Sequence, residues 1–300
     1  TSLGSSMMTI VGHLTLDEVI LRHGTHHNMG GVACYAALAA KLLELDVKII
    51  SKVGADFPKK YLDLLKSMGI DVSEVQIDPK SRTTSFRLNY LSGERELELL
   101  SRAGNLSLDK LEGEAIYLGP VAWEIGIGDI RRLLREHKMV TLDPQGLMRE
   151  LREDYTVALK PINLRLVNLW ALRISREEAR ILSKSVDPKM MLEYLKNVGA
   201  KILILTLGAK GAIIHDGKKQ VMVPCYMVPE VDPTGAGDAF GGAFIAEYIN
   251  SKDVELAAAM GSAAASLVVE EIGFQSLLSP SAKNEIKKRA EEIYELIEEY

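Results

Sequence analysis

The sequence is poor in cysteine, in long apolar runs and in charge of one sign. Its two cysteines, Cys34 and Cys225, lie in no CxxC or metal-ligand spacing, which fits a reducing compartment and two small buried side chains. The longest apolar run, residues 257–269, is Ala-rich and ends at two glutamates, so it predicts a buried helix and no membrane span. The net charge of −5 provides no basic field for nucleic acid or an anionic membrane.

Several well-known motifs are also missing. There is no GxxxxGK[ST] phosphate loop, no HExxH, and no Cys/His ladder for zinc. His23, His26 and His27 are irregularly spaced, and we interpret them as a polar loop, since a metal site needs a full ligand set. Residues 1–6 are interpreted as an expression scar before Met7 or Met8, and we expect a cytoplasmic protein without a secretory signal.

What the chain does contain is an alternation of short β-branched runs and helical stretches, typical of a single α/β domain over residues 7–300. Strands are predicted at 9–11, 47–53, 115–118, 139–142, 166–169 and 201–207. Helices are predicted at 31–45 and 59–68, with further helix starts at Ser175 and Asp187. Near-continuous apolar strands indicate a mostly parallel central sheet sandwiched by helices.

One region departs from this alternation. Residues 83–100 carry alternating apolar and polar side chains around Ser92-Gly93, which predicts a hairpin. We expect a small β lid built from about 14–29 and 80–103. From Ser281 onward, apolar residues recur on one helical face and predict a closing surface helix, and the acidic residues 291–299 are interpreted as its solvated side.

The most specific pattern is Asp232-Pro-Thr-Gly-Ala-Gly-Asp-Ala-Phe240, which leads into a helical run. Gly235 and Gly237 carry no side chains, so backbone N–H groups can approach an anion there, and the helix N-terminus adds partial positive charge. This arrangement suits the charge that develops on a transferring phosphoryl group. The alternative is that Asp238 only caps the helix.

This run resembles the C-terminal signature of the ribokinase (PfkB) superfamily, and the resemblance covers nearly the whole chain. It implies a ribokinase-like fold in which Gly235, Ala236 and Gly237 form an anion hole and Asp238 is the base for the acceptor hydroxyl. The opening Val11-Gly-His-Leu-Thr-Leu-Asp17 resembles the strand whose Asp binds substrate hydroxyls, and Gly30-Gly31 resembles the glycine pair beside the acceptor.

The resemblance also implies a site for ATP and Mg²⁺. Thr206-Leu-Gly-Ala-Lys-Gly211 is similar to the nucleotide-phosphate segment, and the expected nucleotide contacts are Ser175, Thr206, Gly208, Gly211, Thr234 and Ala264. Arg173-Ile-Ser-Arg-Glu-Glu178 is similar to the family's Asn-x-x-Glu motif, with Ser175 in place of the usual Asn and Glu178 organising Mg²⁺ through water. Asp232 and the loop around Gly273 are expected to hold a monovalent cation, K⁺, unless Asp232 only anchors the turn.

The motifs do not identify the substrate, because two sets of them resemble two different groups of kinases. Asp143-Pro-Gln-Gly146 with Arg149 looks like inositol-type kinases, whereas Pro224-Cys225 and the segment after the signature look like archaeal nucleoside kinases. Tyr35 stands where many sugar kinases carry an Asn. The expected substrate contacts are Asp17, Asn28, Gly30, Gly31, Tyr35, Asp143 and Arg149.

We therefore expect an ATP-dependent kinase that phosphorylates a hydroxyl of a small neutral polyhydroxy substrate, either a nucleoside, a cyclitol or a sugar. One alternative is a sugar-phosphate kinase, because Arg82, Arg87 and Arg95 in the lid could hold a phosphate. The other is a catalytically silent binding regulator on the same fold. Beyond ATP and a small molecule, we expect no nucleic acid or membrane partner and consider a homodimer through the lid.

Overall fold

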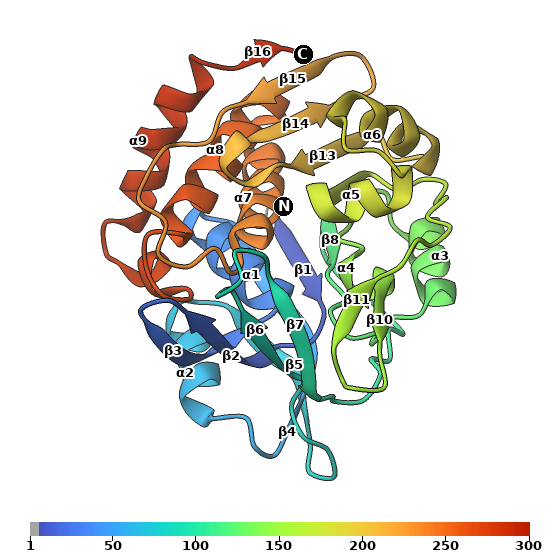
Figure 1. Ribbon diagram of the computed structural model, residues 1–300, viewed down its shortest axis with the longest axis vertical. Coiled ribbons are helices and arrows are strands. Elements are labelled where there is room, and N and C mark those ends of the chain that lie inside the picture. Colours follow the sequence, from blue (N-terminus) through green and yellow to red (C-terminus); the bar gives the residue numbers. More distant parts are fainter. Residues whose placement is uncertain (1–5) are drawn as a thin grey trace, which may run out of the picture.

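The structure, a computed structural model, describes residues 6–300. Its main sheet has the strand order β16-β15-β14-β13-β12-β9-β8-β1-β4-β5 (Figure 1). The strands from β5 to β13 pair in parallel, and β14, β15 and β16 add an antiparallel edge. Their bounds are β1 Met7–Val11, β4 Asp46–Gly54, β5 Asp71–Asp78, β8 Ala115–Leu118, β9 Val140–Leu142, β12 Ala171–Ser175, β13 Ile202–Thr206, β14 Ala212–His215, β15 Gln220–Val223 and β16 Glu298–Glu299.

Helices cover both faces of this sheet, as the continuous apolar strands predict. Successive strand residues point to opposite faces: Ile202 and Ile204 of β13 belong to one buried cluster, and Leu203 and Leu205 to the other. The first cluster packs α1, α2, α7, α8 and α9, and the second packs α3, α5 and α6. The helices are α1 Val32–Leu42, α2 Lys59–Ser67, α3 Ile127–Glu136, α4 Gln145–Met148, α5 Arg176–Ser183, α6 Pro188–Leu195, α7 Ala236–Ser251, α8 Val254–Val268 and α9 Ala282–Tyr294.

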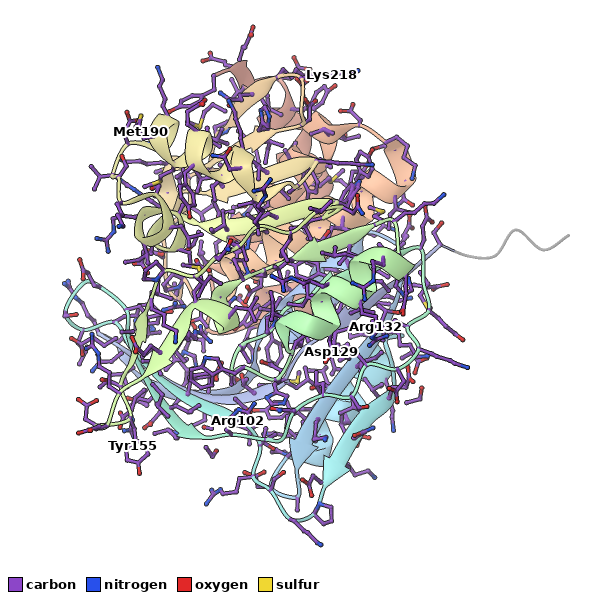
Figure 2. All side chains as sticks on the ribbon, turned by 90° about the vertical axis from the view of Figure 1, so that its right-hand side faces the viewer. Arg102, Asp129, Arg132, Tyr155, Met190 and Lys218 are labelled. Carbon is purple, nitrogen blue, oxygen red and sulfur yellow. The ribbon has the colours of Figure 1, made fainter. Side chains whose placement is uncertain are left out.

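A second sheet of four strands, the lid, lies beside the carboxyl ends of the parallel strands (Figure 1). Its order is β3-β2-β6-β7, with β2 Thr15–Leu21, β3 Gly24–Gly30, β6 Ser85–Asn89 and β7 Glu96–Ser101. The predicted hairpin is therefore present as β6 and β7, and the stretch after β1 supplies the other two strands. A small ladder, β10 Arg149–Leu151 with β11 Val157–Leu159, touches β7, and Tyr155 extends outward from its turn (Figure 2).

Two predictions of secondary structure are wrong. Residues 166–169 form a turn, with Asn168 at φ 70°, and the strand follows at β12. Leu166 and Leu169 are apolar because they are buried in a core cluster as part of a loop, a situation that the apolar pattern does not separate from a strand. The acidic tail is not one solvated helix face, because α9 ends at Tyr294 and Glu298–Glu299 pairs with β15.

Other local predictions are confirmed. The Ala-rich run is helix α8, whose residues are largely buried against α7 and α9. Helix α5 begins with a capping box in which Ser175 and Glu178 bond reciprocally to each other's backbone N–H. Within residues 6–300, none of the helices combines the length and apolar composition that crossing a membrane requires. The proposed scar, apart from Ser6, lies outside the described residues.

Candidate active site

The shape of the turn at residues 232–238 is fixed by the backbone conformation of Gly235, by packing against α1 and by hydrogen bonds to Asp232. Gly235 is at φ 82° and is the N-cap of α7. A Cβ at Gly235 would lie 2.3 Å from the Tyr35 ring, so both the backbone conformation and the packing of α1 require glycine there. Asp232 is fully buried and accepts hydrogen bonds from the Thr234 N–H at 3.0 Å and the Gly273 N–H at 2.9 Å.

Asp238 sits in the first turn of α7, where the helix dipole favours an acid. Its Oδ1 lies 3.3 Å from the Gln145 amide nitrogen and 3.6 Å from Arg173 Nη2. Burial raises the pKa of the carboxyl group to about 6, with Asp143 adding to the rise and Arg173 opposing it. A carboxylate with a pKa near 6 is ionised at neutral pH and is basic enough to accept a proton from a hydroxyl group.

Behind Asp238, Arg173 and Asp143 form a buried ion pair. Arg173 comes from β12 and Asp143 follows β9, the neighbouring strand. The guanidinium donates two hydrogen bonds to Asp143 Oδ2 and a third to Thr206 Oγ1 at 3.1 Å. Asp143 is fully buried, and it was expected to contact the substrate; the structure instead places it out of the pockets, where it orients Arg173.

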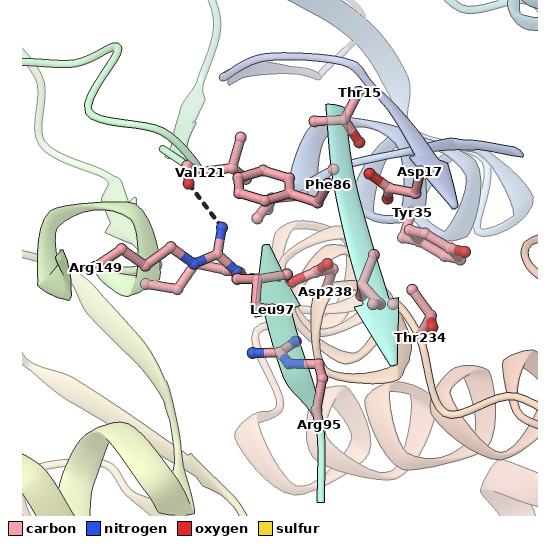
Figure 3. Close-up of a pocket in the computed structure, with 15 residues that line it drawn as sticks. Thr15, Asp17, Tyr35, Phe86, Arg95, Leu97, Val121, Arg149, Thr234 and Asp238 are labelled. Atoms are coloured by element: carbon pink, nitrogen blue, oxygen red, sulfur yellow. Dashed lines mark hydrogen bonds between the residues drawn. The ribbon is translucent and has the colours of Figure 1, made fainter. Parts of the chain in front are cut away.

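A lid pocket of about 50 Å³ lies between the lid and the turn (Figure 3). Asp17 and Tyr35 form one end, Asp238 lies between, and Arg95 and Arg149 form the other end. Asp17 Oδ1 and Thr15 Oγ1 are buried without a hydrogen-bond partner in the described chain, and burial raises the pKa of Asp17 to about 7. The remaining wall is largely apolar: Gly31, Val32, Phe86, Leu88, Leu97 and Val121, with Gln145, Thr234 and Gly235.

Two expected substrate contacts do not line the lid pocket. Asn28 donates to His26 Nδ1 at 2.8 Å and packs on Gly273, outside the pocket. Gly30 affects the pocket only through Asp17, because a Cβ at Gly30 would lie 2.0 Å from Asp17 Oδ2. Its missing side chain makes room for the Asp17 carboxylate. Gly31, at φ 91° and against the His13 carbonyl, does line the pocket.

A large cleft of about 480 Å³ opens on the other side of Asp238. Arg95, Gln145, Arg149, Thr234, Gly235 and Asp238 line both the cleft and the lid pocket. The cleft runs past Ser175, Thr206, Gly208 and Gly211 toward α8, where an apolar wall is formed by Cys225, Tyr226, Met227, Val228, Phe240, Ala265 and Val269. Ala264 was expected here, but it faces the core, and its neighbours Ser262, Ala265 and Ser266 line the cleft.

Comparisons with known proteins agree on one family. Residues 1–282 match the description pfkB family carbohydrate kinase. The chain belongs to this family. It is 29% identical to cytidine kinase of Thermococcus kodakarensis over 90% of this chain and 98% of that protein. It is 25% identical to inositol 3-kinase of Arabidopsis thaliana over 93% of this chain and 79% of that protein.

Solved structures with the same fold include a pyrophosphate-dependent kinase in the ribokinase family, in complex with sulfate, with a TM-score of 0.82 and 24% identity over 94% of this chain and 99% of that one. Ribokinase of Arabidopsis thaliana, complexed with ribose and ATP, has a TM-score of 0.76 and 18% identity over 95% and 99% of the two chains. The chain is thus a PfkB kinase, a phosphotransferase with an alcohol group as acceptor.

PfkB kinases use ATP with a divalent metal, and Glu178 of this PfkB kinase fits a metal held through water. Glu178 Oε2 accepts from the Ser175 N–H at 3.2 Å, whereas Oε1 is buried without a partner in the described chain and the residue lines the cleft. Burial raises its pKa to about 7, against the effect of Arg173. Within residues 6–300, no group of three or more His, Cys, Asp or Glu side chains could hold a metal directly.

Asp232 is the residue expected to hold a monovalent cation, and the structure shows it as an anchor of the turn. Besides the two N–H donors, His26 Nε2 of the lid lies 3.1 Å from Asp232 Oδ2. Because Asn28 donates to His26 Nδ1, the Nε2 atom carries the proton of the neutral ring and faces the carboxylate. The histidines were expected to form a polar loop, but only His23 lies in a turn, whereas His26 and His27 belong to strand β3. The monovalent cation stays a prediction.

Several polar residues of the PfkB site could not be assigned a role from the sequence. Arg173 and Gln145 stand inside quoted motifs, and their types and places beside strand ends were the available signal. Tyr90 of the lid was not singled out either, and its hydroxyl lies 3.0 Å from Thr234 Oγ1, which joins the lid to the turn. From the sequence, Arg95 is expected only as a possible ligand for the phosphate of a sugar phosphate, whereas in the structure it lines both pockets beside Asp238.

Proposed function

We propose that this PfkB kinase transfers the γ-phosphoryl group of ATP to a hydroxyl of a small neutral polyhydroxy ring, in the presence of Mg²⁺. The observation that carries the proposal is the position of Asp238, which lines both the lid pocket and the large cleft. A base at the junction can take the proton of an acceptor held on one side while the phosphoryl group arrives from the other.

The acceptor hydroxyl gives its proton to Asp238, and its oxygen forms a bond to the γ-phosphorus. The bond between that phosphorus and the bridging oxygen breaks, and ADP leaves through the cleft. Bound Mg²⁺ would neutralise phosphate charge, with Glu178 holding its water.

Backbone N–H groups of the turn supply the anion hole. The first N–H groups of a helix have no partner within the helix. The Ala236 N–H donates to the Pro233 carbonyl at 3.3 Å, so we assign the principal contacts with the phosphoryl group to Gly235 and Gly237. A Cβ at Gly237 would lie 2.5 Å from Arg173 Nη1, and this residue must therefore stay small beside the guanidinium.

The contents of the lid pocket favour a neutral acceptor. The unpartnered oxygens of Asp17 and Thr15 suit hydroxyl groups. Arg87 is occupied by Glu18 at 2.6 Å and Glu98 at 2.9 Å. Arg82 is exposed in the segment before β6, near Asp56, and does not line the pocket.

The remaining arginines lie toward the cleft. Arg149 donates to the Val121 carbonyl at 2.6 Å and to Gln145 Oε1 at 2.8 Å, and it stacks on Phe86 at 4.9 Å (Figure 3). Arg95 lies beside Asp238, where the transferring group would pass. A sugar phosphate would require an unpaired arginine guanidinium at the Asp17 end of the lid pocket to bind its existing phosphate. Neither Arg149 nor Arg95 lies at that end.

The shape of the cleft favours a nucleotide donor. Its apolar wall around Tyr226, Met227 and Ala265 extends well beyond the phosphate-binding turn. The nucleobase and ribose of ATP would cover this wall, whereas pyrophosphate would leave it exposed to solvent. A single ring fits the small lid pocket best, as either a cyclitol or the ribose of a nucleoside, and the likeness to cytidine kinase supports testing nucleosides first.

A turnover panel tests the proposal. Nucleosides, cyclitols, free sugars and fructose 6-phosphate are each measured with ATP and with pyrophosphate, and kcat/KM is compared. We expect a neutral acceptor with ATP to give the highest value. A higher kcat/KM for fructose 6-phosphate would contradict the neutral acceptor, and a higher value with pyrophosphate would contradict the nucleotide donor. Specific binding of a panel compound without turnover of any would favour the silent regulator.

A further inference from the structure

The side chain of Gln145 makes three polar contacts at the junction of the two pockets, although neither the sequence motifs nor the proposed chemistry gives it a role. Its Nε2 lies 3.3 Å from Asp238 Oδ1 and 3.3 Å from Asp143 Oδ1. Its Oε1 accepts from Arg149 Nη2 at 2.8 Å. It stands at the start of the short helix α4, two residues after Asp143, which follows strand β9.

The orientation of the amide follows from its partners. Arg149 can only donate, so the atom that faces it must be the carbonyl oxygen. The carboxylates of Asp143 and Asp238 accept, so the NH₂ group faces them. A glutamine is the one side chain of this length that offers an acceptor to Arg149 and donors to two carboxylates without a charge of its own.

These contacts distinguish the two oxygens of Asp238. The Gln145 amide and the Arg173 guanidinium both approach Oδ1, and within residues 6–300 no hydrogen bond involves Oδ2. We infer that Gln145 is a positioning residue that holds Oδ1 of Asp238, so that Oδ2 faces the acceptor and takes its proton. The inference rests on the proposed role of Asp238 as base.

The same contact favours the ionised form of the base. Asp238 is surrounded by charges of both signs: Asp143, Arg173, Arg149 and Arg95, with Asp17 farther along the lid pocket. Burial and Asp143 raise the pKa of Asp238, and a donor on Oδ1 counteracts this rise by stabilising the anion. Loss of the Gln145 amide should therefore raise the pKa of Asp238 and move the acid limb of activity to higher pH.

The experiment measures kcat/KM against pH for wild type, Gln145→Met and Gln145→Glu. Methionine keeps the length of the side chain and removes the donors, and we expect the acid limb to move up by about one pH unit, the equivalent of one hydrogen bond to a charged group. Glutamate places a third carboxylate beside Asp143 and Asp238, so its shift should be at least as large. Gln76→Met on the exposed strand β5 is the matched control and should leave the profile unchanged.

A second readout does not depend on turnover. Carboxyl-carbon NMR titration of Asp238, assigned with Asp238→Asn, should give a higher pKa in Gln145→Met than in wild type. A uniform loss of activity at every pH with an unchanged pKa would overturn the inference and leave Gln145 as a packing residue. Failure of wild type to turn over any acceptor would count against the proposed function instead, and the NMR result would still decide the role of Gln145.

Discussion

Asp238→Asn separates the two interpretations of this residue, a base and a helix cap. Asparagine has almost the same shape and still suits the first turn of α7, but it cannot accept the acceptor proton. Loss of a general base typically lowers kcat by ~10²–10⁴-fold, which is about 3–5 kcal/mol of transition-state free energy. We expect a loss of this size, with the acceptor KM changed much less.

The structure also predicts the sign of the stability change. The pKa of Asp238 is raised from 3.8 to about 6, mainly by burial. A carboxyl group with a raised folded-state pKa contributes its stability at low pH and loses it as pH rises through the folded pKa. The shift corresponds to about 3 kcal/mol above pH 6, so Asp238→Asn should have a Tm equal to or above that of wild type at pH 8, and the advantage should shrink toward pH 4.

The assay is ADP release at saturating ATP and Mg²⁺ with the best acceptor of the panel, together with thermal unfolding at pH 4, 6 and 8. Asp253→Asn is the matched control, because Asp253 caps α8 by accepting from the Glu255 and Leu256 N–H groups at 3.0 Å. It should leave kcat unchanged. A kcat of Asp238→Asn within about threefold of wild type would refute the base assignment, which requires a ~10²-fold loss at least. A lower Tm of Asp238→Asn than of wild type would indicate that activity is lost because the fold is destabilised.

Further outcomes follow from the same site. In wild type, kcat/KM should fall tenfold per pH unit below about pH 6, since the base must be ionised and the pKa of Asp238 is about 6; a flat profile to pH 5 would exclude it as the titrating group. Glu178→Gln keeps an oxygen for the Ser175 N–H but removes the charge, so it should raise the Mg²⁺ concentration for half-maximal activity by ~10-fold or more. An unchanged Mg²⁺ titration would remove Glu178 from the metal site. If Asp232 only anchors the turn, rates should be equal in sodium, potassium and tetramethylammonium buffers, whereas a rate several-fold higher in potassium would establish the cation site.

Much of the site could be predicted because its chemistry lies in short contiguous segments. The run from Asp232 to Asp238 contains the glycines that the turn requires, the start of the helix and the acid together. Gly235 could be identified because its left-handed conformation, at φ 82°, is a local need of the turn, whereas its close contact with the Tyr35 ring arises only in the folded chain. The capping box of Ser175 and Glu178 is likewise a four-residue pattern that determines its own geometry.

The partners of these segments depend on how the chain folds back on itself. Asp143 was expected to contact the substrate because its segment resembles that of inositol-type kinases, but the neighbouring strand β12 places Arg173 against it, and the pair lies behind Asp238. Gln145 and Asp238 are 93 positions apart and meet only because α4 and α7 begin at the same edge of the sheet. The sequence of residues 166–169 fits a strand and a buried turn equally well, and only the packing of the folded chain distinguishes the two.

The sequence by itself therefore determined the glycine turn, the acid in the first turn of the following helix and the α/β class, because glycine conformation, helix capping and strand periodicity act over a few residues. The tertiary structure decided which oxygen of Asp238 is held, which arginines are already paired, and where the lid closes on the turn through Tyr90 and Thr234. These properties depend on contacts between distant segments, and no local preference specifies them.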